Sequence, residues 1–255
     1  MNKKIKVLVT AGDTYELIDD VRKITHMATG RLGSLIADEF TRCGASVTFL
    51  CGERSMRPVL EMEKAMEIQG VLALQDAMKK LLAETQFDAV IHSMAVSDYV
   101  VRGLTTEDDI ADELSENIAD LNTCDGEQLL TQLKQAMNSA MFNSTGKISS
   151  DLESLVVLLD RAPKVISHVK QMQPKTILVG FKLLSDVSEE ELLQAAQKQM
   201  QTSGSDFVLA NDLAAIDGDN HGSMLIGQQG VLDRLSTKQD IAQSIVRHVM
   251  QSVKG

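Results

Sequence analysis

The chain has 255 residues, enough for one large domain or two small ones, and its 44% hydrophobic and 24% charged residues are an ordinary globular composition. The formal net charge of −11 argues against nucleic-acid binding, because a protein that binds the phosphate backbone needs a basic face. No apolar stretch reaches 18 residues, and the N-terminus lacks the pattern of a signal peptide, so we expect no membrane span and a cytoplasmic location.

Strands and helices alternate along most of the chain. Short β-branched runs predict strands at residues 5–10, 46–50, 88–94, 176–181 and 206–212. Apolar residues at helical spacing predict helices at residues 30–44, 73–86 and 188–202 and a last helix through Met250. The alternation predicts an α/β fold with a Rossmann-like, doubly wound, mainly parallel sheet. Residues 223–235 differ, because a Gln-Gln-Gly turn between two strand-like runs predicts a C-terminal antiparallel hairpin.

Residues 103–146 interrupt this alternation. They hold nine acidic residues against one base, Lys134, and so carry a net charge of −8. Two apolar stripes at helical spacing run through them, formed by Ile110, Leu114, Ile118 and Leu121 and then by Leu129, Leu133, Met137 and Met141. We therefore predict a single domain over residues 1–255 with an acidic helical insertion at about 103–146. The stripes would pack on the body or on a second subunit, and a regulatory partner surface is the alternative.

The cysteines and histidines offer no metal site. Cys43, Cys51 and Cys124 are odd in number and match no metal-ligand spacing, which indicates free thiols in a reducing compartment. The five histidines are scattered along the chain. We therefore expect no metal held by the protein's own side chains.

Polar residues follow four of the expected strands, in "TAGDT" at 10–14, "AVSDY" at 95–99, "KLLSD" at 182–186 and "ND" at 211–212. In open α/β sheets, ligands bind beyond the carboxyl ends of the strands. Asp98 or Asp212 alone also suits a helix cap or a turn. Because all four clusters fall at the same edge of the sheet, together they predict one polar cleft.

The stretch "ATGRLG", residues 28–33, predicts an anion site at a helix start. Gly30 and Gly33 permit close approach to the backbone, and Thr29 suits the N-cap position. Unpaired N–H groups and the positive end of the helix dipole favour a phosphate or carboxylate, although an ordinary capped helix is the alternative. Neither G-x-G-x-x-G nor the P-loop pattern is present, so no motif indicates a dinucleotide or a Walker-type ATPase.

Two lysines could add positive charge to the cleft. Lys147 lies in "STGKISS" beside a glycine, and Lys198 lies on the helix after "VGFKLLSD". Either one could neutralise a triphosphate, although a lysine on its own is more often a solvated surface residue.

The motifs taken in order resemble those of phosphopantothenate–cysteine ligases, in the bacterial form that is not fused to the decarboxylase flavoprotein. The resemblance rests on "LVTAGDTYELIDDVRKIT…TGRLG", "VIHSMAVSDY", "GKISS", "PKVI", "ILVGFKLLSD" and "DFVLAND". It implies a reaction of coenzyme A synthesis, in which 4′-phosphopantothenate is activated as an acyl-nucleotide and then joined to L-cysteine. It also implies CTP rather than ATP as the nucleotide, Mg²⁺ with that nucleotide, and a homodimer.

The resemblance assigns roles to residues of this chain. Phosphopantothenate would be bound by Gly12, Arg22, Thr29, Gly30, Gly33 and Asn211. The nucleotide would be bound by Ala95, Asp98, Lys147, Lys164, Val165, Ile166, Ser167, Phe181 and Lys198. The catalytic residues would be His26 and Lys147.

Three positions depart from the family pattern and keep a second hypothesis open. His26 replaces an asparagine, Asp13 replaces the second glycine of its motif, and Thr202 replaces a lysine. The second hypothesis is a paralogue that binds phosphopantothenate or nucleotide without completing ligation. A third, an NAD(P)-dependent reductase of Rossmann type, is disfavoured by the missing glycine fingerprint.

Overall fold

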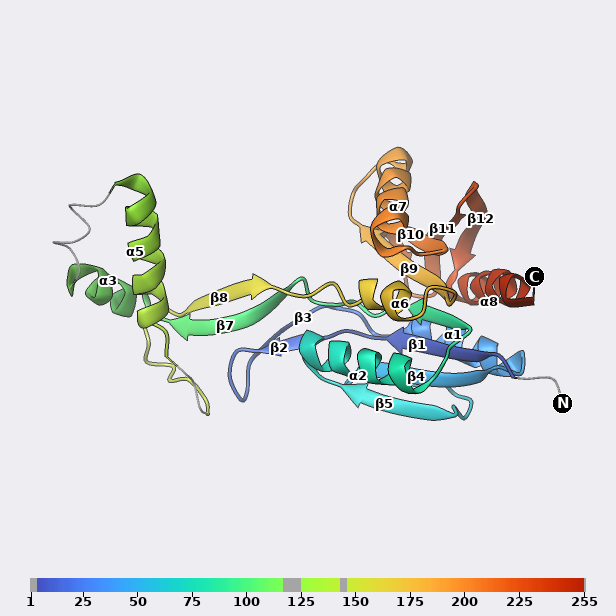
Figure 1. The fold of residues 1–255 in the computed structure, drawn as a ribbon, viewed down its shortest axis with the longest axis horizontal. Coiled ribbons are helices and arrows are strands. Elements are labelled where there is room, and N and C mark those ends of the chain that lie inside the picture. The colour runs from blue at the N-terminus through green and yellow to red at the C-terminus, as the bar shows by residue number, and fades with distance from the viewer. Residues whose placement is uncertain (1–3, 117–124, 143–145, 255) are drawn as a thin grey trace. The chain divides into compact units, whose positions relative to one another are not determined.

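The computed structural model describes residues 4–116, 125–142 and 146–254. The chain forms two compact units (Figure 1). The first, here called the sheet unit, comprises Met1–Thr14, His26–Ser97 and Pro163–Gly255. The second, the ribbon unit, comprises Tyr15–Thr25 and Asp98–Ala162. That the whole chain acts as a single domain stays a prediction.

The sheet unit is built on an eight-stranded sheet of order β12-β11-β10-β9-β6-β1-β4-β5. Its strands are β1 (Lys6–Ala11), β4 (Ser46–Gly52), β5 (Lys64–Ile68), β6 (Ala89–His92), β9 (Ile177–Leu184), β10 (Phe207–Asp217), β11 (Asn220–Gly227) and β12 (Gly230–Thr237). Neighbours from β5 to β10 run parallel, and β11 and β12 are antiparallel. The predicted Rossmann-like sheet with a C-terminal antiparallel hairpin is confirmed, whereas the edge strand β5 was not predicted.

Helices cover both faces of this sheet. The helices α1 (Arg31–Arg42) and α8 (Lys238–Lys254) lie on one face. Phe40 of α1 and Ile245 of α8 pack with Val9 and Phe49 of the sheet in a buried hydrophobic core. On the other face, α7 (Glu189–Ser203) packs Ala196 against the sheet, and α6 (Ser167–Met172) links α7 to α2 (Gly70–Glu84). The sheet is therefore doubly wound, as predicted. In the described part of the chain, no helix has the length and apolar character that a membrane span needs.

Among its described residues, the ribbon unit contains two antiparallel strand pairs and two helices. The strands are β2 (Tyr15–Leu17) with β3 (Lys23–Thr25), and β7 (Tyr99–Thr105) with β8 (Val156–Arg161). The helices α3 (Glu107–Glu116) and α5 (Gly126–Ser139) confirm the predicted helical insertion. Ile118 and Leu121 of the first apolar stripe, and Cys124, lie outside the described residues. Neither strand pair was predicted. The strands β2 and β3 have only three residues each, and β7 and β8 are partly exposed and far apart in sequence.

The strand order creates one switch point, between β1 and β6. From β1 the chain adds β4 and β5 on one side, and it then returns to add β6, β9 and β10 on the other. At such a point the two loops that follow the central strands diverge and leave a crevice, where open α/β sheets bind their ligands. The loops here begin at Gly12 and Ser93.

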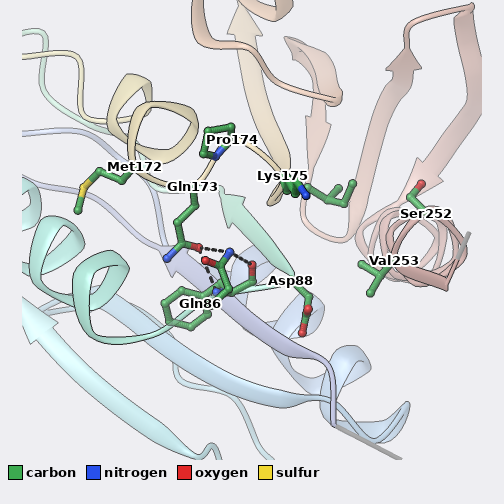
Figure 2. Close-up of a pocket in the computed structure, with 10 residues that line it drawn as sticks. Gln86, Asp88, Met172, Gln173, Pro174, Lys175, Ser252 and Val253 are labelled. Atoms are coloured by element: carbon green, nitrogen blue, oxygen red, sulfur yellow. Dashed lines mark hydrogen bonds between the residues drawn. The ribbon is translucent and has the colours of Figure 1, made fainter.

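Gln173 organises the opposite, amino-terminal end of the sheet. Its Nε2 donates to the carbonyls of Leu82 and Thr85 at 2.6 and 2.7 Å, and its Oε1 accepts from the Phe87 N–H at 3.0 Å. The side chain thus closes the C-terminal end of α2 and joins it to the start of β6. It also lines a cavity of about 530 Å³ that contains none of the predicted site residues (Figure 2).

Replacing Gln173 by alanine should destabilise the fold, because it leaves the buried N–H of Phe87 and two helix carbonyls without partners. An unsatisfied buried polar group costs ~1–3 kcal/mol, so a loss of about 3 kcal/mol in the free energy of unfolding is expected. Urea denaturation measures it. The matched control is Gln171→Ala, an exposed glutamine two residues away, which should change stability by less than about 0.5 kcal/mol. Equal effects of the two changes would contradict this role for Gln173.

Candidate substrate-binding site at the switch point

Three of the predicted site glycines pack tightly around the switch point. Gly12 and Gly30 have φ angles of +81° and +76°, which residues other than glycine rarely adopt. A Cβ on Gly30 would lie 3.1 Å from the Gly12 nitrogen, and one on Gly12 would overlap the Ser55 hydroxyl. A Cβ on Gly33 would lie 2.5 Å from that of Ala11. Glycine at these positions lets the turn after β1 and the start of α1 touch backbone to backbone.

The start of α1 presents its positive end without an acidic side chain. Gly30 is the N-cap, and no side chain caps the helix. The prediction that Thr29 is the N-cap is therefore wrong, because the left-handed conformation of Gly30 starts the helix one residue later. The Thr29 hydroxyl instead accepts from the Arg31 N–H at 3.4 Å. The N–H groups of the first turn have no acceptor within the helix, so this end suits an anion.

The loop after β6 runs beside the turn after β1. The Ala95 N–H donates to the Gly12 carbonyl at 2.8 Å, and the Thr14 N–H donates to the Ala95 carbonyl at 3.0 Å. His92, the last residue of β6, is buried, and burial lowers its pKa to about 4, so the ring is neutral near pH 7. Its Nδ1 lies 3.0 Å from the Thr10 hydroxyl. The structure thus brings together Gly12, predicted for phosphopantothenate, and Ala95, predicted for nucleotide.

A second group of predicted residues lies within β9 and β10, at the start of α6 and on α7. In the segment Lys164–Ser167, the Ser167 N–H donates to the Lys164 carbonyl at 3.2 Å, Val165 is buried and Lys164 is exposed. The Ile166 side chain approaches within 3.4 Å of where a Cβ on Gly180 would lie, beside Phe181. Asn211 pairs in register with Leu183 of β9 and is buried, whereas Lys198 on α7 is exposed.

The ribbon unit holds the remaining predicted residues, Arg22, Asp98 and Lys147. The Asp98 carbonyl accepts from the Ala162 N–H at 2.8 Å, where the β7–β8 pair begins. Arg22 and the segment after Lys147 both bond to Asp19, whose side chain is fully buried. The Arg22 guanidinium, together with backbone N–H donors, holds the pKa of Asp19 well below its usual range, so this carboxylate stays ionised.

The three departures from the family pattern have different surroundings. His26 is exposed, so its ring is accessible to a ligand. The Thr202 hydroxyl donates to the carbonyl of Lys198 at 2.9 Å, so it is bonded to its own helix and supplies no charge. Asp13 lies in the paired loops, opposite Ala95. The fold therefore accommodates all three residues.

Several residues that support the predicted site residues were not themselves predicted, two of them in the sheet unit and one, Asp19, in the ribbon unit. Ser55 packs against Gly12 and Gly30, and Ser93 donates from its hydroxyl to the Thr10 carbonyl at 2.6 Å. Asp19 joins segments 129 positions apart in the chain. The one signal for Asp19 is its place three residues before Arg22, which suits a short turn closed by a carboxylate.

Comparison with known proteins places the chain among relatives from coenzyme A metabolism. The coenzyme A biosynthesis bifunctional protein CoaBC of Thermococcus kodakarensis is 33% identical over 242 residues, which are 94% of this chain and 49% of that protein. The chain spans about half the length of the curated relatives it matches.

Solved structures show the same fold. The DNA/pantothenate metabolism flavoprotein from Streptococcus pneumoniae superposes with a TM-score of 0.78 and 32% identity, covering 97% of this chain and 99% of that one. A mutant of Cab2 in complex with phosphopantothenate-cysteine has a TM-score of 0.67 at 17% identity, with 98% of this chain and 88% of that one covered, a likeness of fold alone.

The family model of the DNA/pantothenate metabolism flavoprotein C-terminal domain matches residues 2–139 and 136–253, nearly the whole chain. Together with the 33% identity to the Thermococcus protein, this match shows that the chain belongs to the family of the DNA/pantothenate metabolism flavoprotein C-terminal domain.

Proposed function

We propose that this protein is a ligase of coenzyme A biosynthesis that joins 4′-phosphopantothenate to L-cysteine and uses CTP. The observation that carries the proposal is the glycine-packed turn at the switch point, where Gly12 and Gly30 meet beside the uncapped start of α1. This turn suits a phosphate group, as expected of the phosphopantothenate end of the substrate. Family membership and the Thermococcus relative's name support the pathway.

The proposed reaction has two steps. The carboxylate of phosphopantothenate attacks the α-phosphorus of CTP, forming an acyl-cytidylate and releasing pyrophosphate. The cysteine amine then attacks the acyl carbon, forming the amide, releasing CMP and losing a proton. Since phosphopantothenate and CTP both carry phosphates, the protein's contribution is mainly to place them in line and to offset negative charge.

The adjacency of Gly12 and Ala95 supports this division of roles. Phosphopantothenate held at the start of α1 and a nucleotide held at the loop after β6 would share one crevice, because the two loops are hydrogen bonded. The segment Lys164–Ser167 and Phe181 would contact the cytosine, and Lys147 and Lys198 the phosphates. Lysines bind phosphate oxygens rather than Mg²⁺, so the metal would arrive with CTP as part of that substrate. We also propose that the protein is a homodimer and acts in the cytoplasm.

A second candidate function is favoured by His26 and Thr202. If an asparagine amide is needed for turnover, the exposed imidazole of His26 is a poor replacement, because it is bulkier and has one N–H donor where the amide has two. Thr202 also supplies no cation. A protein with these changes could bind phosphopantothenate or nucleotide as a regulator without completing ligation.

The purified protein should release pyrophosphate from CTP only when phosphopantothenate is present, and it should form phosphopantothenoylcysteine only when cysteine is added. ATP should support a slower reaction. A coupled pyrophosphate assay and mass spectrometry of the product measure both steps. Absence of pyrophosphate with either nucleotide would rule out the ligase.

Substituting Lys147 by alanine should lower the rate of pyrophosphate release by roughly 100-fold, because loss of a positioned donor removes charge stabilisation in the transition state. The control is Lys134→Ala on α5, an exposed lysine of the same unit, whose rate should stay within about twofold of the wild type. Rates measured at saturating CTP and phosphopantothenate make the comparison. A similar loss in both variants would contradict a specific role for Lys147.

The change His26→Asn separates the two candidate functions. For an efficient ligase in which His26 acts in place of the amide, restoring asparagine should change kcat by less than about threefold, a difference of under ~1 kcal/mol in the activation barrier. A rise of roughly tenfold or more would favour the binding paralogue. Steady-state kinetics with CTP, phosphopantothenate and cysteine decide between them.

A further inference from the structure

We propose that Asp19 is a positioning residue that holds Arg22 and the Lys147 segment together as one anion-binding element. The inference rests on the proposed function and on the roles that the family resemblance implies, phosphopantothenate binding for Arg22 and triphosphate binding for Lys147. All three residues belong to the ribbon unit, so the geometry that carries the inference lies within one compact body.

Both oxygens of the Asp19 carboxylate are occupied. Oδ1 accepts from the N–H groups of Val21 and Arg22 at 2.9 and 2.7 Å, which closes the turn between β2 and β3. Oδ2 accepts from Arg22 Nε at 2.9 Å, from Arg22 Nη2 at 2.6 Å and from the Ile148 N–H at 3.1 Å. A single buried carboxylate therefore fixes its own turn, the arginine side chain and a distant segment of the chain.

These contacts determine which edge of Arg22 remains for a ligand. Nε and Nη2 face Asp19, and Nη2 also donates to the Ile148 carbonyl at 3.1 Å. Nη1 takes no part in these contacts, and the side chain is 43% exposed. Because the guanidinium is planar, fixing two of its nitrogens also fixes the direction of the third. Arg22 thus presents a preoriented pair of N–H donors and a positive charge to an anion.

The same contacts fix the backbone immediately after Lys147. The Ile148 N–H donates to Asp19, its carbonyl accepts from Arg22, and the residue is buried, whereas Lys147 itself is exposed. The exposed lysine side chain therefore extends from an anchored backbone. Fixing this backbone in advance lowers the entropy that binding a phosphate must overcome. Asp19 would act on both substrates without touching either one.

The test compares Asp19→Asn with Asp20→Asn. The second change removes the same charge from an exposed neighbour and is the matched control. We expect Asp19→Asn to lower kcat/KM for CTP by about 10- to 100-fold, and Asp20→Asn to change it less than about twofold. In a Lys147→Ala background, Asp19→Asn should cost less than about threefold, since residues that act as a unit are non-additive. Full additivity, or equal effects of the two asparagine variants, would overturn the proposal.

Hydrogen exchange at the Ile148 amide reads the coupling without any activity. The amide should be protected in the wild type and in Asp20→Asn and should exchange at least about tenfold faster in Asp19→Asn. Unchanged exchange would refute the role of Asp19 even in an active enzyme. Loss of protection in a protein that releases no pyrophosphate would uphold the coupling while disproving the ligase.

If Asp19→Asn fails to fold, Arg22→Lys carries the same test. Lysine keeps the charge but loses the paired Nε and Nη2 donors that bridge Asp19 and Ile148. Although Arg22 is assigned to phosphopantothenate, this change should also raise KM for CTP by about fivefold or more and speed exchange at Ile148. An effect confined to the KM for phosphopantothenate would overturn the proposal.

Discussion

The close approach of backbone at Gly12, Gly30 and Gly33 is the constraint on which the candidate site depends. A methyl group at any of the three would collide with Ser55, Gly12 or Ala11. With glycine there, the turn after β1 lies directly against the first turn of α1, whose N–H groups have no acceptor within the helix. The Ala95 N–H then bonds to the Gly12 carbonyl, so the loop after β6 is added to the same surface. The candidate anion site is thereby made almost entirely of backbone N–H donors. This explains why the site needs few distinctive side chains.

The order of the strands turns this local packing into a binding crevice. Because β1 and β6 are neighbours and the later strands are added on opposite sides of them, their carboxyl ends lie at the switch point where open α/β sheets bind ligands. The cores on the two faces, formed by α1 and α8 on one side and α7 on the other, hold those ends in place. At the other end of the sheet, Gln173 satisfies the carbonyls of α2 and the N–H of Phe87. The candidate site and the stabilising contacts of Gln173 thus lie at opposite ends of the same strands.

The sequence predicts the sheet well and the supporting contacts of the site poorly, for a physical reason. Buried parallel strands such as β1 and β4 read as continuous apolar runs, and glycines at a helix start are visible by position alone. The edge strand β5 and the pairs β2–β3 and β7–β8 are partly exposed, so no burial pattern marks them. Thr29 was expected to be the N-cap because hydroxyls favour that position, but the left-handed backbone of Gly30 starts the helix instead. Asp19 is paired with Ile148, 129 residues away, and no periodicity reports such a contact.

The net negative charge of the chain explains why the orientation of its cationic side chains matters for binding anions. The chain carries −11, and residues 103–146 alone carry −8, yet both proposed substrates are anions. At physiological salt, exposed charges are screened beyond ~8 Å, so the acidic insertion opposes binding weakly unless it lies close to the ligand. By the same screening, a lysine or arginine helps only when it is held within a few ångströms of a phosphate. One of the chain's negative charges, that of Asp19, is buried and accepts hydrogen bonds from five donors. The outer edge of Arg22 stays exposed, and the backbone beside Lys147 is anchored. An acidic protein can therefore bind anionic substrates by fixing a few cations in place rather than by carrying many.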